Sequence, residues 1–98
     1  MYSMEQLITV LTTEKACELR FCAGKPPIVA LENYEYPLQG PPVPADEVER
    51  LLRSIASSRQ IRELQQPGTV QFVFTVKDRM PVLVQAQMED MKIAFNIS

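Results

Sequence analysis

The last third of the chain contains three stretches in which apolar and polar residues alternate. These stretches cover 69–76, 82–88 and 91–97, and their apolar positions are Val70, Phe72, Phe74, Val76, Val82, Val84, Ala86, Met88, Met91, Ile93, Phe95 and Ile97. A period of two is typical of strands with one buried face. Short turns at 77–80 and 89–90 separate the stretches. The pattern therefore predicts an antiparallel three-strand meander.

A shorter strand is predicted over 17–22, where Glu18 and Arg20 alternate with apolar residues. Gly24 ends this strand, and the proline pair after it cannot continue a ladder of hydrogen bonds. We therefore expect Gly24, Pro26 and Pro27 to form a structural turn.

Residues 28–31 and 34–38 predict two strands of a hairpin joined by a tight turn at 32–35. Tyr34 and Tyr36 lie in the second strand. Aromatic side chains concentrate at interface cores, so the two tyrosines are candidates for partner contact, although packing within the domain would explain them as well.

Helical spacing of apolar residues predicts three helices. The first covers about 4–15, and Ser3 with the glutamine three residues later can form a capping box at its start. After a proline-containing linker at 39–47, an apolar stripe over 48–55 predicts the second helix. Ser57-Ser58 can cap a short third helix that ends before Pro67-Gly68.

The element order is helix, three strands, two helices, three strands. It favours an α+β domain in which the N-terminal hairpin and the C-terminal meander form one PAS-like antiparallel sheet with helices on one face. The chain has 98 residues, which fits a single domain over 1–98. The linker at 39–47 is placed inside this domain, because nothing before it is large enough to fold alone.

The composition of the chain argues against several classes of protein. Hydrophobic residues make up 46% of the chain and the net charge is −2, which argues against disorder and against nucleic acid as the partner. No apolar run is long enough for a membrane span, so no membrane insertion is expected. The N-terminus lacks the features of a signal peptide, and a cytoplasmic protein is expected.

The reactive residue types are few. There are two cysteines and no histidine, so no metal site is expected. Cys17 and Cys22 would point to opposite faces of one strand and cannot bridge each other, so we expect buried or half-buried free thiols. No residue is placed to act as a general base, and no cofactor motif is present. The sequence therefore predicts a chain that is not an enzyme and needs no cofactor.

The stretch ACELRF, two residues, then GKPP covers 16–27. It resembles a segment in the N-terminal domain of the type IV pilus twitching-motility ATPases (the PilT/PilB family), which is close to ASDLHL, two residues, then GxPP. The linker, two helices and the strands VQFVFTV and MPVLVQA follow in that family's order. The resemblance implies a PAS-like domain that packs against the ATPase core of a neighbouring subunit in a hexamer and helps to close its nucleotide site.

The chain departs from that family at charged positions. Arg20 stands where the family has histidine, and the hairpin arginine is replaced within 28–31. Two further arginines of the family fall at Val82 and Val84. Apolar side chains cannot contact phosphate as a guanidinium does. The Walker A pattern is absent from this sequence, so we expect that the chain does not bind ATP alone.

Four charged residues are candidates for partner contact. Glu18 and Arg20 lie on the outer face of a predicted strand, where the alternative is a solvated ion pair. Arg50 and Arg53 lie on the second helix, where docking to an acidic partner competes with a simple solvated face. Met80, Met88 and Met91 are interpreted as core residues, with a binding groove as the alternative.

The leading hypothesis is a non-catalytic interaction domain. Its partner would be a pilus motor ATPase or a motility regulator, or a second copy bound through a sheet edge or hairpin. One alternative is a PAS-like sensor of a small apolar ligand, which needs a cavity beneath the helices. Another is a small acidic dimer similar to a secretion chaperone, which needs an exposed apolar groove.

Overall fold

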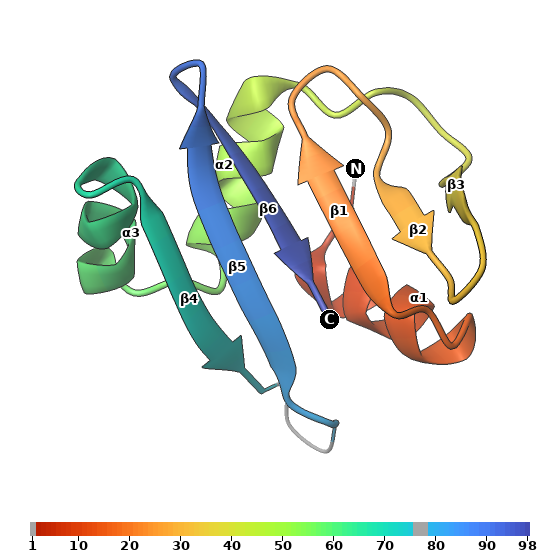
Figure 1. Cartoon of the computed structure of the whole chain (residues 1–98). Coiled ribbons are helices and arrows are strands. Elements are labelled where there is room, and N and C mark those ends of the chain that lie inside the picture. Colours follow the sequence, from red (N-terminus) through yellow and green to blue (C-terminus); the bar gives the residue numbers. More distant parts are fainter. Residues whose placement is uncertain (1, 76–78) are drawn as a thin grey trace.

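A computed structural model describes residues 2–75 and 79–98. Its elements, shown in Figure 1, are α1 (Met4–Thr13), β1 (Glu18–Cys22), β2 (Ile28–Ala30), β3 (Glu35–Pro37), α2 (Ala45–Arg53), α3 (Ser58–Gln65), β4 (Thr69–Phe74), β5 (Val82–Glu89) and β6 (Lys92–Ile97). The predicted α+β class is confirmed. Val76 and the first half of the turn predicted at 77–80 lie outside the described residues.

One six-stranded sheet has the order β3-β2-β1-β6-β5-β4, and every neighbouring pair is antiparallel. The first strand therefore lies beside the last. Leu19 faces Ile97 and Phe21 faces Phe95 across this junction. The junction joins the N-terminal hairpin to the C-terminal meander in one antiparallel sheet, as the sequence predicted.

Local capping fixes where two helices begin. Ser3 accepts a hydrogen bond from the Gln6 backbone N–H, and the Gln6 side chain accepts one from the Ser3 backbone N–H. Ser57 and Gln60 repeat this capping box at the start of α3. Each box satisfies backbone donors that would otherwise lack a helical partner. The glycine of the predicted turn, Gly24, has a positive φ of 83°, a conformation that favours glycine.

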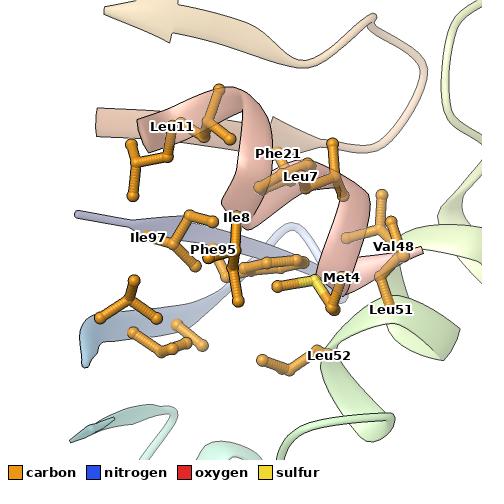
Figure 2. Packing of buried hydrophobic residues seen from close by; sticks show 14 of the residues in the cluster. Met4, Leu7, Ile8, Leu11, Phe21, Val48, Leu51, Leu52, Phe95 and Ile97 are labelled. Carbon is orange, nitrogen blue, oxygen red and sulfur yellow. The ribbon is translucent and has the colours of Figure 1, made fainter. Parts of the chain in front are cut away.

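The helices and one face of the sheet enclose the core. Phe21 and Phe95 stack at its centre, with ring centroids 4.5 Å apart. Figure 2 shows Ile8 of α1 lying beside Phe95 and Ile97 of β6. The side chains that are less than a tenth exposed include Leu7, Ile8, Leu11, Leu19, Phe21, Val29, Val48, Leu51, Leu52, Ile61, Leu64, Val84, Phe95 and Ile97.

The opposite face of the sheet carries no helix, and we call it the open face. Strand alternation places Glu18, Arg20 and Cys22 on it, because their neighbours Leu19 and Phe21 point into the core. Figure 1 looks onto this face, with α1 and α2 behind the sheet. The fold thus leaves a broad strand surface available to other molecules.

The prediction that three methionines belong to the core is wrong. Met80, Met88 and Met91 are 79%, 38% and 93% exposed. Met80 precedes β5, Met88 lies near the end of β5, and Met91 lies in the turn before β6. Alternation identifies the face on which a residue lies, but it does not show how far along a strand the helices extend.

The prediction of buried or half-buried thiols is also wrong, because Cys17 and Cys22 are both exposed. Cys17 lies just before β1. Cys22 is the last residue of β1 and lies on the open face. Both thiols are free, as predicted.

Replacing Phe21 with alanine is expected to cost about 3–5 kcal/mol of unfolding free energy, because it removes one ring of the central stack and leaves a cavity. Domains of this size have only about 5–15 kcal/mol in total, so the variant should be close to unfolding. Urea denaturation followed by circular dichroism measures the change. Met80→Ala, at an exposed site, is the control and should change stability by less than about 0.5 kcal/mol. Equal effects of the two substitutions would contradict this core assignment.

Candidate protein-interaction surface

Arg20 is the centre of an ion-pair network on the open face. It donates from Nε to Glu18 on its own strand, and from Nη1 to Oε2 of Glu35 on β3 at 2.7 Å. The hydrogen bond to Glu18, with the charges of both carboxylates, raises the pKa of the Arg20 guanidinium. The structure therefore joins Glu18 and Arg20, both predicted contact residues, to Glu35, which was not predicted.

The two predicted tyrosines have different surroundings. Tyr34 is 64% exposed in the turn before β3. Tyr36 lies in β3, half-buried against the core, and its ring centroid is 6.2 Å from that of Tyr34. Desolvation, followed by the nearby charge of Glu14, raises the pKa of the Tyr36 hydroxyl. Tyr34 thus presents an exposed ring beside Tyr36, on the opposite side of the hairpin from the Glu35 carboxylate, whereas Tyr36 mainly supports the hairpin.

Arg50 and Arg53 lie on α2, on the other side of the sheet from Arg20. Arg50 donates from Nε to Oε1 of the buried Glu47 at 2.8 Å and from Nη2 to the Tyr2 carbonyl at 2.9 Å. Arg53 lies 3.3 Å from the carboxylate of Glu49. Both arginines are therefore paired with acidic residues of their own helix, and together they present mixed charge rather than a basic patch.

A row of amide side chains extends from Arg20 across the open face. Strand register places Arg20 beside Asn96 of β6, Asn96 beside Gln85 of β5, and Gln85 beside Gln71 of β4. Gln85 donates from Nε2 to Oε1 of Gln71 at 3.3 Å. The Oδ1 atom of Asn96 is buried and accepts no hydrogen bond. A buried polar atom without a partner is costly.

The amide row forms part of an open hollow of about 560 Å³. Its lining includes Arg20, Cys22, Gln71, Gln85, Gln87 and Asn96. Pockets for small molecules are usually enclosed and mainly apolar. An open hollow lined by amides fits a polar protein surface better. This row was not predicted, although the uncharged Gln71, Gln85 and Asn96 at outward positions of the last three strands were its signal.

The turn between β5 and β6 was predicted, but the exposed side chain at its tip was not. Asp90 and Met91 have positive φ values of 50° and 65°, as a two-residue type I′ turn requires. Glycine is favoured at the second of these positions, yet Met91 occupies it with 93% of its surface exposed. A strained backbone that presents an apolar side chain to solvent points to a contact role.

Two smaller hollows were found. One of about 370 Å³ lies between Tyr2 and the proline-rich segment 41–44, and one of about 180 Å³ lies at the tip of the β5–β6 hairpin beside Cys22. The space beneath the helices is filled by fully buried side chains such as Leu7 and Leu51. Neither of these hollows supplies the enclosed apolar cavity that a ligand sensor of the PAS type needs.

Within residues 2–75 and 79–98, no three His, Cys, Asp or Glu side chains cluster in a way that could hold a metal ion. The same ranges contain no helix of the length and apolar character needed to cross a membrane.

No protein-family model matches the chain, and no curated protein matches it in sequence. Solved structures do match its fold. The pilus retraction motor PilT with bound ADP superposes with a TM-score of 0.89 at 22% identity, over 99% of this chain and 29% of the motor chain. The ATPase DotB of Legionella pneumophila superposes with a TM-score of 0.81 at 12% identity, over 98% of this chain and 28% of DotB.

The chain therefore spans less than a third of either ATPase. The matched region is the N-terminal part, outside the ATPase core. The resemblance inferred from residues 16–27 is thus confirmed at the level of the fold.

Glu47→Gln is expected to lower the melting temperature near neutral pH and to matter less in acid. The hydrogen bond from Arg50 outweighs burial and lowers the pKa of Glu47. A lowered pKa contributes stability above the group's ordinary pKa, and this contribution is lost as the pH falls through the lowered value. The melting temperatures of wild type and variant should therefore converge between about pH 7 and pH 3. Glu49→Gln, on the exposed side of α2, is the control, and a gap that stays constant with pH would contradict the expectation.

Met91→Gly is expected to stabilise the fold by about 1 kcal/mol, because glycine adopts a positive φ without the steric cost of a side chain. Asp-Gly is also a preferred type I′ pair. Urea denaturation measures the difference from wild type. Met80→Gly, at an exposed position without a positive φ, should give no such gain. A destabilised Met91→Gly protein would show that Met91 packs within the fold.

Proposed function

We propose that this chain is a non-catalytic interaction domain that docks on protein partners. The observation that carries the proposal is the structural match of 99% of the chain to 29% of a pilus retraction motor. Since the matched part excludes the ATPase core, the chain resembles the accessory part of such a motor. The proposed partner is a pilus motor ATPase or a motility regulator, and the proposed location is the cytoplasm.

The ion pairs of Arg20 support a role without nucleotide binding. Arg20 is paired with two carboxylates. A phosphate group would have to displace those carboxylates to reach the guanidinium.

The proposed docking surface is the open face together with the β5–β6 hairpin tip. Arg20 and its carboxylates supply charged groups that can exchange partners, and the exposed amides of Gln71 and Gln85 supply uncharged donors and acceptors. Met91 supplies an apolar anchor at the rim. Interfaces commonly combine a few such anchors with a polar surround. Tyr34 lies with Tyr36 on the other side of the hairpin and is proposed only as a separate contact.

Arg50 and Arg53 are proposed only as a secondary contact. An acidic partner on α2 would have to compete with Glu47 and Glu49, which already pair with them.

Mixing the purified chain with pilus motor ATPases should give co-elution in size-exclusion chromatography with light scattering. Gln85→Arg places a long charged side chain in the centre of the amide row and should abolish co-elution. Thr13→Arg is the control, because it adds the same charge at an exposed residue at the end of α1, on the other side of the sheet. Calorimetric titration with ATP should show no binding to the isolated chain.

ATP binding by the isolated chain, or co-elution that survives Gln85→Arg and is lost in Thr13→Arg, would contradict the proposal. A chain that binds neither motors nor motility regulators would also contradict it, while the fold assignment would stand.

A further inference from the structure

The sheet has two edges, and they differ in how well they are protected. The β3 edge is formed by only three residues, Glu35–Pro37. Proline, charge and short length are the devices by which natural edge strands avoid pairing with other chains. The β4 edge, Thr69–Phe74, is twice as long and reads TVQFVF, with neither a charge nor a proline.

The backbone of β4 presents hydrogen-bonding groups to this edge. The Gly68 carbonyl accepts from the Met88 N–H at 3.0 Å, which places the residue before β4 in a hydrogen-bonded pair with β5. Antiparallel pairs alternate between bonded and non-bonded positions. Val70, Phe72 and Phe74 therefore bond to β5.

The N–H and C=O groups of the intervening residues, Thr69, Gln71 and Val73, point away from β5. The pairing of β5 with the last strand confirms this alternation. Leu83, which lies opposite Val73, exchanges both of its backbone hydrogen bonds with Ser98, the residue after β6, at 3.0 Å each. Its backbone groups therefore point away from β4.

The second half of β4 also carries apolar side chains that are exposed or only half-buried. Val73 is 64% exposed on the open face, and Phe72 and Phe74 are only half-buried at the border of the core. Helix α3 contacts β4 and lies beside its beginning (Figure 1). β4 is the outermost strand at this end of the sheet. One more strand added beside its second half would cover the side chains of Phe72, Val73 and Phe74.

We propose that the second half of β4 pairs antiparallel with the same segment of a second copy of the chain. This segment can pair with its own copy, because it contains no charged residue that would face a like charge across the two-fold axis. Pairing would satisfy the outward groups of Gln71 and Val73 and cover Phe72, Phe74 and Val73 with their counterparts. Because the β3 edge is blunted, the assembly closes at two copies instead of growing into a fibre.

This dimer does not depend on the docking proposal. It is strand-mediated, so it also differs from a helix-mediated dimer of the secretion-chaperone type.

Light scattering of the full chain over a range of concentrations tests the proposal. Wild type should reach a mass of twice 11.1 kDa. Val73→Lys, with a lysine at the edge, should remain at the monomer mass with an unchanged circular dichroism spectrum. Val73→Pro is a second variant, because the N–H that it removes does not bond to β5. Met80→Lys is the matched control at another exposed apolar site, and it should remain a dimer.

A wild-type chain that stays monomeric at millimolar concentration would overturn the proposal, as would a Val73→Lys protein that still dimerises. A third result would also overturn the dimer proposal: the wild-type chain is monomeric alone, and the Val73→Lys variant no longer binds a motor. That result would show that the β4 edge accepts a strand of another protein. A monomeric Val73→Lys protein that still co-elutes with a motor would separate dimerisation from docking.

Discussion

The pairing of the first strand with the last is the constraint on which the structure depends. The β1–β6 junction joins the strands β1–β3 to the meander β4–β6, and the buried residues of both halves form one core cluster. Phe21 and Phe95 meet across it as stacked rings. Because the two strands come from opposite ends of the chain, their pairing carries a loop-closure cost that only the completed core repays. All three helices then lie against the face that this pairing creates.

The same pairing assembles the candidate interaction surface. Arg20 comes from the hairpin unit and Asn96 from the meander, and they become neighbours only when β1 and β6 pair. The amide row continues from Asn96 through Gln85 to Gln71, so one line of polar side chains crosses the open face. Helices that cover the opposite face leave this line exposed. A surface of this kind suits reversible protein docking better than enclosure of a small ligand.

Period-two alternation, capping pairs and turn residues were sufficient to predict the helices and strands, because each acts within a few residues. The Ser3 and Ser57 caps and the positive φ at Gly24 are examples. The missed features depend on tertiary structure. The exposure of Met88 depends on where the helices end above the sheet, and the orphaned oxygen of Asn96 depends on the neighbours that the strand register supplies. The free edge of β4 likewise follows from strand order and hydrogen-bond phase, which no local pattern contains.

The central claim is that the open face is where this PilT-like fold meets its partners, and the two cysteines provide an internal test. Cys22 lines the hollow on the open face, whereas Cys17 precedes β1 outside it, and both thiols are exposed. The measurement is the alkylation rate of each thiol by mass spectrometry, with and without a saturating pilus motor ATPase. The account predicts that the motor slows alkylation of Cys22 and leaves Cys17 unchanged. Slower alkylation of Cys17 alone, or no change at Cys22 in a formed complex, would contradict it.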